Sequence, residues 1–188
     1  DYVLVYQNNG AWDDKPIGWA EHAVGQITRI ADLSGDSIYL SSPLRITFDE
    51  ALDPRIKSID PVVNAGIQCV KISRLDEPSS GGGANIFLRY TANCVVRGVE
   101  SDVSAGSHID IFSSTNILID GCYIHHAFDY DGASKHGYGI TLNDQTGECL
   151  ITNNIFEHLR HAMMVKTGAN GNVFSYNYSL DAYRSEWP

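Results

Sequence analysis

Imidazole and carboxylate side chains gather at one corner of a pattern that repeats along this sequence. When the repeats are aligned, His126 lies beside His158, and His161 follows three residues later. Imidazole titrates near neutral pH and is oriented by a neighbouring carboxylate, so such pairs suit general acid–base catalysis. We therefore predict His126, His158 and His161 as candidate catalytic residues. The neighbouring column of the alignment holds the carboxylates and a further imidazole: Asp102, His125, Glu157 and Asp181.

The same corner offers ligands for a metal ion. Asp129 and Asp131 supply the carboxylate oxygens that Ca²⁺ prefers, although their surroundings match only a fragment of a calcium-binding loop. The imidazoles suit Zn²⁺, and His125 has Glu157 beside it. These four residues are the candidate metal ligands, and Ca²⁺ is the candidate cofactor. A third interpretation stays open, in which the cluster consists of hydrogen-bonded turn residues without chemistry.

A second candidate site lies on the outward face of predicted strands. Elimination from a uronic acid needs a base near the C5 proton and cations that neutralise the carboxylate, so Arg89, Asp110 and Lys166 are candidate catalytic residues. Asn143 and Tyr138 are candidate substrate-binding residues. The alternative is a solvated sheet face with exposed charges. Further rings suited to stacking on sugars are Tyr176, Tyr178, Tyr183 and Trp187.

Four similar lines of sequence position these residues. Their first residues are separated by 23, 32 and 24 positions (116 − 93, 148 − 116 and 172 − 148), so one interval contains an insertion of about nine residues around 129–136. A period in this range indicates stacked units, and short β-branched runs ended by Gly or Asn give each unit strands and turns. The sequence predicts an all-β, right-handed parallel β-helix of about six coils of roughly 23 residues. The four lines begin at Asn93, Asn116, Glu148 and Asn172.

Alternation along the predicted strands assigns each side chain to the interior or to the outward face. The outward face then carries polar and charged residues that we expect to meet solvent, His108 and Asp110 among them. The interior pairs are Ile86/Leu88, Ile109/Ile111, Ile140/Leu142 and Met163/Val165. One further column falls at a turn, where Gly and Asn tolerate left-handed backbone: Gly98, Gly121, Asn153 and Asn177.

The N-terminal part has a different pattern. Alternating β-formers around a turn at 33–36 predict an antiparallel hairpin within residues 24–48. We expect residues 1–61 to be an N-terminal β segment that leads into coils over 62–188. Because the ends of a β-helix expose unpaired strand edges, we also expect a further segment or chain that caps or continues the stack.

Composition narrows the function classes. The 188 residues carry 13 Lys and Arg against 23 Asp and Glu, a net charge of −10, with no basic cluster, which disfavours binding to nucleic acid. Such a surface suits neutral glycans or divalent cations. The absence of a long apolar run disfavours membrane insertion. The four cysteines lack a CxxC pair. Cys94 and Cys149 share a column, but a whole coil lies between them, which is too far for a disulfide, so we expect buried free thiols.

The repeated lines resemble the pectate-lyase-like right-handed β-helix superfamily, over roughly residues 62–181. The segments 92–100, 153–159 and 168–179 carry the resemblance, which is closest to uncharacterised secreted bacterial β-helix proteins. The resemblance implies action on acidic polysaccharides, by calcium-assisted β-elimination or carboxylate-mediated hydrolysis, although the superfamily also includes adhesins and tail-spike shafts. His108 and Ile111 replace the residues expected around a lyase Ile-Asp motif, and no Arg-x-Pro-x-x-Arg segment is present, so no catalytic residue is transferred.

The sequence thus predicts a protein, secreted or at the cell surface, that binds or acts on polysaccharide, as a uronate polysaccharide lyase or a glycoside hydrolase. The alternative, from another class, is a non-catalytic structural or adhesive module of a large extracellular protein.

Overall fold

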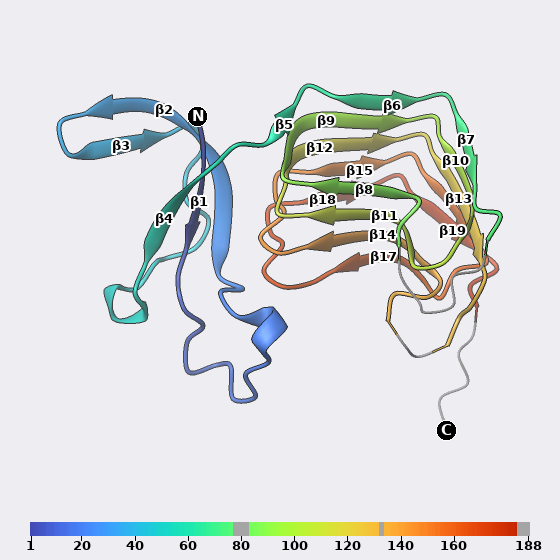
Figure 1. Ribbon diagram of the computed structural model, residues 1–188, viewed down its shortest axis with the longest axis horizontal. Helices are drawn as coiled ribbons and strands as arrows, with labels where there is room; N and C mark the ends of the chain where they lie inside the picture. The colour runs from blue at the N-terminus through green and yellow to red at the C-terminus, as the bar shows by residue number, and fades with distance from the viewer. Residues whose placement is uncertain (77–82, 132–133, 184–188) are drawn as a thin grey trace.

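The computed structural model describes residues 1–76, 83–131 and 134–183. Within these residues the regular structure is almost entirely β, with two three-residue 3-10 turns, η1 (Gly18–Ala20) and η2 (Glu50–Leu52). An antiparallel sheet lies beside a stack of parallel coils (Figure 1). No helix in the described ranges is long and apolar enough to cross a membrane.

The N-terminal sheet has the order β3-β2-β1-β4 and is antiparallel throughout. Ser34 pairs with Ser37, so a two-residue loop closes the predicted hairpin, and Gly35 supplies the left-handed conformation (φ 57°) that this turn requires. The strands are β1 (Tyr2–Tyr6), β2 (Gly25–Ser34), β3 (Ser37–Leu40) and β4 (Arg55–Ile59).

The remaining strands form three parallel sheets, and every coil passes through them in the same order. Sheet 1 contains β8 (Ile86–Arg89), β11 (Ser107–Phe112), β14 (Tyr138–Asn143) and β17 (His161–Val165). Sheet 2 contains β5 (Val62–Val63), β6 (Gly66–Gln68), β9 (Thr91–Arg97), β12 (Thr115–Asp120), β15 (Leu150–Thr152) and β18 (Val173–Ser175). Sheet 3 contains β7 (Lys71–Ser73), β10 (Glu100–Ser104), β13 (Tyr123–Ala127), β16 (Ile155–Glu157) and β19 (Tyr178–Leu180).

This arrangement confirms the predicted right-handed parallel β-helix. The described residues form four complete coils, which are preceded by a partial coil made of β5, β6 and β7. This number is smaller than the predicted six, because the residues before Val62 enter the antiparallel sheet instead of the stack.

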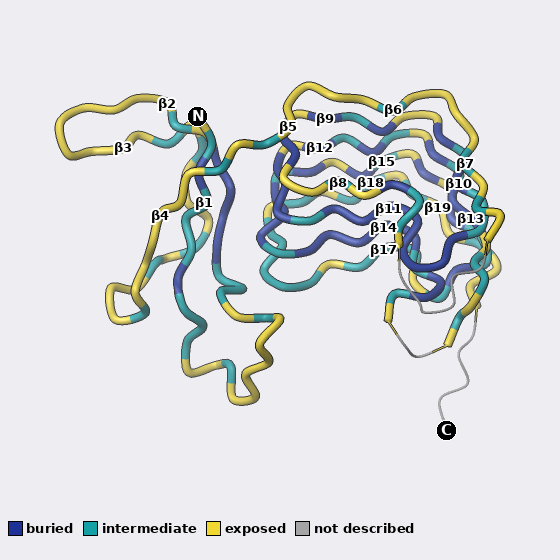
Figure 2. Tube along the Cα trace, in the orientation of Figure 1, coloured by how far each residue is buried: buried dark blue, intermediate teal, exposed yellow. Residues whose placement is uncertain are grey.

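Aliphatic ladders fill the interior of the coils. Ile109, Ile111, Ile140 and Leu142 are fully buried, as the alternation predicted, and the middle coils are the most deeply covered (Figure 2). In the last coil Val165 is 44% exposed, although it continues the same interior column. Each interior residue therefore depends on the coils stacked on both of its sides.

Strand pairing corrects the alignment of the last repeat by one residue. Val95 pairs with Leu118, which pairs with Leu150, which pairs with Val173. The intervals are therefore 23 (118 − 95), 32 (150 − 118) and 23 (173 − 150), not 23, 32 and 24. One consequence is that Asn177 does not share the turn column of Gly98, Gly121 and Asn153, since Tyr176 (φ 52°) occupies that left-handed position.

Asn177 instead belongs to a short asparagine ladder with Asn154. The Asn154 side chain accepts a hydrogen bond from the backbone N–H of Cys122 (2.9 Å) and donates to the carbonyl of Ile119 (3.2 Å). The carboxamide oxygen of Asn177 accepts from the backbone N–H of Asn154 (3.1 Å). These bonds satisfy buried backbone groups at the turn between sheets 2 and 3, so the ladder stabilises the corner of the last coils.

Pairing also locates the insertion. Phe112 pairs with Asn143, an interval of 31 (143 − 112), whereas Leu118 and Leu150 are 32 apart (150 − 118). Relative to 23, eight extra residues therefore lie between β13 and β14, and one lies in the turn after β14. The longer part leaves the stack between sheets 3 and 1 (Figure 1).

Hydrogen bonds attach the N-terminal sheet to the β-helix. The Arg45 guanidinium donates to Glu148 Oε1 (2.8 Å) and to Asn170 Oδ1 (2.8 Å), and Asn170 Nδ2 donates to the carbonyl of Gly25 (2.8 Å). At Gly168 a β-carbon would lie 1.5 Å from the carbonyl oxygen of Ala23, so only glycine permits this close approach.

The four cysteines are free, as predicted, but they do not share one environment. Cys94, Cys122 and Cys149 are buried, whereas Cys69 is exposed, which corrects the expectation that all four are buried. Burial raises the pKa of the Cys149 thiol to about 12, so this group remains a neutral, inert part of the core.

Candidate functional site

The outward face of sheet 1 is not the solvated surface that the sequence suggested. His108 and Thr141 are fully buried, and Asp110 and Asn143 are nearly so. The chain between β13 and β14 covers part of this face, because Lys135 reaches across it to pair with Asp110. Arg89 and Phe87 are exposed, so solvent reaches the first-coil edge of the sheet.

Asp110 is the centre of a polar cluster on this face. Asn143 Nδ2 donates a 2.5 Å hydrogen bond to Asp110 Oδ1, and the Lys135 ammonium pairs with Oδ2 of the same carboxylate. The structure thus joins two predicted site residues, Asp110 and Asn143. Lys135 was not predicted, because it lies in the insertion and reaches sheet 1 only through the path of that loop.

Lys166 follows β17 and continues the outward column that contains Asn143. Its ammonium lies 5.5 Å from the centre of the Trp19 ring. Partial burial lowers the pKa of Lys166, and the nearby Lys135 charge lowers it further, while Asp110 and Asp144 act in the opposite direction. The amine is therefore easier to deprotonate than an ordinary lysine.

The other two predicted residues of this face lie apart from the Asp110 cluster. The Arg89 guanidinium stacks over the rings of Phe112 (5.0 Å) and Tyr90 (5.3 Å). Tyr138 begins β14, where its ring meets His161 edge-on at 4.7 Å and the Arg160 guanidinium at 4.9 Å. We predicted that His161 lies with His158. Within the described residues, the ring in contact with His161 is that of Tyr138.

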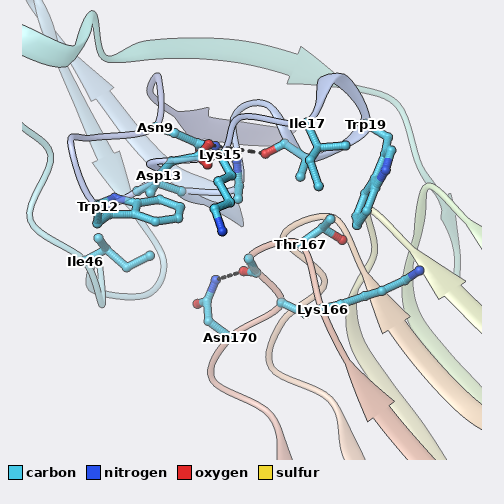
Figure 3. A pocket seen from close by; sticks show the side chains of 15 residues that line it. Asn9, Trp12, Asp13, Lys15, Ile17, Trp19, Ile46, Lys166, Thr167 and Asn170 are labelled. Atoms are coloured by element: carbon cyan, nitrogen blue, oxygen red, sulfur yellow. Dashed lines mark hydrogen bonds between the residues drawn. The ribbon is translucent and has the colours of Figure 1, made fainter. Parts of the chain in front are cut away.

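A cavity of about 470 Å³ lies between the N-terminal segment and the turn after β17. Trp12 and Trp19 stand on opposite sides of it, Lys15 points into the space between them, and Lys166 extends beneath Trp19 (Figure 3). Both indoles are largely exposed, at 62% and 65%. Asp13 also lines the cavity, and its carboxylate accepts a 2.6 Å hydrogen bond from Asn9.

Sequence reasoning missed this cavity. Its walls come from residues near 10–20 and near 166–170, which no motif connects. The available signal was the pair of tryptophans seven positions apart in a segment without alternating apolar residues. Single exposed apolar side chains are ordinary, but two exposed indoles that line the same cavity are typical of a binding site.

The histidine corner has the predicted neighbours. The rings of His126 and His158 stack with centroids 5.4 Å apart. The Nδ1 atoms of His125 and His126 are 2.9 Å apart, within hydrogen-bond distance. His158 Nδ1 lies 2.8 Å from Asp181 Oδ2, so Asp181 belongs to the His158 column and not to that of His125, in agreement with the corrected register.

The predicted metal ligands divide into two groups. The Glu157 carboxylate accepts a hydrogen bond from the Tyr123 hydroxyl, and Asp102, not Glu157, joins His125 and His126 in a set whose ligand atoms lie within 4.8 Å of one another. In the insertion, Asp129 and Asp131 form a second such set with His136, a residue that was not predicted. His136 Nδ1 lies 2.8 Å from Asp131 Oδ1.

His108 is a structural histidine. Its Nδ1 lies 2.8 Å from Ser101 Oγ, and its Nε2 lies 2.7 Å from the backbone carbonyl of His126. Burial lowers the pKa of His108 to about 4, so the ring is neutral at neutral pH. Tyr176, Tyr178 and Tyr183 are exposed near the last coil, and Trp187 lies outside the described residues.

Three parallel sheets wound by successive coils of 23 residues, one of them lengthened by the insertion, define the class of right-handed parallel β-helix proteins. Residues 63–179 match the family model described as a right handed beta helix region, and the chain belongs to that family. A search of curated proteins finds no match. One similar solved structure is the tailspike protein gp49 from Pseudomonas phage LKA1, with 12% identity and a TM-score of 0.46. The match covers 95% of this chain but only 37% of that chain.

Proposed function

We propose that this protein binds an acidic polysaccharide in the cavity between Trp12 and Trp19 and across the partly exposed edge of sheet 1 from Lys166 to Arg89. The observation that carries the proposal is the composition of the cavity, which is lined by two exposed indoles, Lys15 and Lys166, with the Lys166 ammonium at the Trp19 end. Indole rings stack on the apolar faces of sugars, and ammonium groups pair with sugar carboxylates.

The charge distribution supports an anionic ligand at this place. The chain carries a net charge of −10, so lysines gathered at one cavity oppose the general sign of the surface. Asp13 is the counter-charge in the cavity, and the Asn9 amide holds it. An anionic sugar is therefore guided to the lysines and away from the rest of the protein.

The β-helix supplies a repeat that fits a polymer. Successive coils are about 4.8 Å apart, a spacing close to the length of one sugar residue. The outward column from Lys166 to Arg89 crosses four coils, and three of its side chains, Lys166, Phe112 and Arg89, are at least partly exposed, while Asn143 is buried against Asp110. A polysaccharide along this column meets a cation at each end. Such a ligand is extracellular, so the proposal includes secretion or display at the cell surface.

Calorimetry of uronate and sulfated oligosaccharides binding to the full chain tests this proposal. We expect the double variant Lys15→Met/Lys166→Met to lose at least about tenfold in affinity, because one charge-assisted contact contributes on the order of 1.5–3 kcal/mol. Trp19→Ala also weakens binding by removing a stacking face. Lys57→Met on exposed β4 is the matched control and leaves affinity unchanged. Equal affinity of the control and the double variant contradicts the proposal.

Elimination from a uronate is a second candidate function, favoured by the lowered pKa of Lys166 beside Asp110 and Lys135. The neutral Lys166 amine takes the C5 proton of the uronate. The electron pair forms a C4–C5 double bond, the C4–O bond breaks, and the leaving oxygen takes a proton from the Lys135 ammonium. Asn143 holds Asp110, which positions that ammonium.

The ultraviolet absorbance of the unsaturated product measures this reaction, with and without EDTA. Lys166→Met abolishes product formation while oligosaccharides still bind through the tryptophans, whereas a binding-only protein gives no product with any uronate. A chain that neither binds nor cleaves a panel of acidic glycans supports the non-catalytic structural module instead.

A further inference from the structure

We propose that Asp102, His125 and His126 form a binding site for a transition-metal ion, with Zn²⁺ as the expected ion. The site lies on sheet 3, where β10 supplies Asp102 and β13 supplies both histidines. It is separate from the residues to which we assign the polysaccharide, so the two proposals stand or fall independently.

The backbone at His126 brings the two imidazoles together. In a regular strand, consecutive side chains point to opposite faces, so adjacent histidines cannot share a ligand. His126 has a left-handed conformation (φ 60°), and its ring turns back until its Nδ1 lies 2.9 Å from that of His125. Val103, His158 and Asp181 have the same conformation in the neighbouring coils, so the stacked corner imposes this turn.

The distances between the ligand atoms suit tetrahedral coordination. Zn²⁺ binds nitrogen and oxygen at 2.0–2.2 Å, which gives tetrahedral edges of about 3.3 Å. The His125 Nδ1 lies 2.9 Å from His126 Nδ1 and 3.4 Å from Asp102 Oδ1. All three ligand atoms lie within 4.8 Å of one another, so small side-chain rotations complete the set.

Neighbouring side chains hold the ligands as they do in zinc sites. His125 Nε2, the nitrogen that faces away from the ion, lies 3.3 Å from Glu100 Oε1, and a metal-bound imidazole commonly donates to a carboxylate in this way. Ser73 Oγ donates to Asp102 Oδ2 (3.3 Å), and Lys71 pairs with both carboxylates. The His125 ring stacks on Tyr123 at 4.2 Å. Two of the three ligands are therefore fixed before an ion arrives.

Three protein ligands leave a coordination position open, which is typical of a zinc site that binds a further ligand. His126 is exposed, whereas His125 is buried, so the open position faces solvent on the His126 side. The ring of His158 stacks on His126 and meets Tyr130 edge-on, so aromatic rings continue from His126 along this surface. A water molecule or an anionic oxygen ligand fits the open position.

The set in the insertion, Asp129, Asp131 and His136, serves as the matched comparison. Its carboxylates are exposed, and Asp129 Oδ1 already accepts the backbone N–H groups of Tyr130 (2.6 Å) and Asp131 (2.9 Å). These bonds give Asp129 a structural role in its own turn. We therefore place the ion at the sheet 3 set.

The test uses the full chain, freed of metal by EDTA and dialysis, and titrated with Zn²⁺ by calorimetry and with Co²⁺ by absorption spectroscopy. We expect one ion per chain and the intense visible bands of tetrahedral Co²⁺. Because His126 is exposed, His126→Gln leaves the fold intact, as circular dichroism checks, and weakens Zn²⁺ binding by at least about tenfold. Glu100→Gln weakens binding about tenfold through the orientation of His125.

The comparison variant Asp131→Asn keeps the affinity and the Co²⁺ spectrum of the unmodified chain. If Asp131→Asn loses the ion while His126→Gln retains it, the ion belongs to the insertion and the proposal is wrong. A chain that binds neither Zn²⁺ nor Co²⁺ overturns it equally.

Discussion

At the scale of single residues, burial decides which polar side chains have a structural role and which remain available to a ligand. His108 and His126 are both histidines of the same coil. His108 is fully buried with both ring nitrogens at hydrogen-bond distance from protein atoms, whereas His126 is exposed and stacks on His158. The sequence could place both rings in their columns, but it could not show that other side chains cover one of them.

The buried His108 makes the stability of the fold depend on pH. Its pKa is about 4 in the folded chain against about 6.5 when unfolded, so between these values the unfolded state binds a proton that the folded state excludes. The free energy of unfolding therefore falls as pH decreases from 6.5 to 4, by up to about 3 kcal/mol. Urea denaturation across this range, compared with His108→Gln, measures the effect. An identical pH dependence in the variant contradicts it.

Lys166 provides a second prediction at the residue scale. The Lys135 charge contributes to its lowered pKa, so Lys135→Met raises the pKa of Lys166 towards that of an ordinary lysine. An NMR titration of the lysine side chains follows this change directly. Lys57→Met is the control and leaves the Lys166 titration unchanged, and an equally unchanged pKa of Lys166 in Lys135→Met would show that the two ammonium groups do not interact.

At the scale of elements, the turns between sheets 2 and 3 set the register of the coils. Adjacent asparagines have different tasks there. Asn153 is exposed in a left-handed conformation (φ 55°), whereas Asn154 is buried and bonds to backbone groups of the preceding coil.

This difference predicts a large loss of stability for one substitution to glycine and almost none for the other. Asn154→Gly leaves the N–H of Cys122 and the carbonyl of Ile119 without their partner and lowers the free energy of unfolding by roughly 3 kcal/mol. Asn153→Gly changes it by less than about 0.5 kcal/mol, because glycine adopts the left-handed conformation readily. Denaturant unfolding of the two variants gives the comparison, and equal losses would refute the assignment.

The repeat was predictable because each coil places similar residues at similar turns, and this periodicity also located the insertion. The one-residue error in the last repeat arose because Asn177 resembles the turn asparagines, while Tyr176 occupies their left-handed position. Residue type indicates that a turn is near, but backbone pairing determines which residue adopts it. Strand pairing confirms the predicted column of Asp102, His125 and Glu157. The Tyr123 hydroxyl binds the Glu157 carboxylate, however, so Asp102 is the carboxylate in the set with His125 and His126.

At the scale of the whole molecule, the attachment of the N-terminal sheet creates the cavity that we assign to polysaccharide. Gly168 lies against the carbonyl of Ala23, and Trp19 then lies over Lys166 while Trp12 stands on the opposite side of the cavity (Figure 3). Contacts between residues about 150 positions apart leave no periodic signal in the sequence. The sequence could therefore propose Lys166 but could not supply its partners Trp12, Lys15 and Trp19.

Two glycine substitutions test this attachment. Gly168→Ala places a methyl group against Ala23 and loosens the N-terminal sheet, which we expect to appear as faster hydrogen exchange of β1 and β2 and weaker oligosaccharide binding. Gly121→Ala has the same left-handed backbone but open space around it, so it costs only about 1–2 kcal/mol of backbone strain and leaves exchange in β1 and β2 unchanged. The same exchange pattern in both variants would contradict this role of Gly168.

If an acidic polysaccharide runs from the tryptophan cavity across the edge of sheet 1 between Lys166 and Arg89, affinity depends on oligosaccharide length, which calorimetry with a series of uronate oligomers measures. Because four coils provide the outward column, affinity for uronate oligomers should rise with length and level off at about four sugar residues beyond the cavity. Arg89→Met, at the far end, should lower the affinity for long oligomers only. Affinity that does not depend on length, or that Arg89→Met leaves unchanged for every oligomer, would contradict the account.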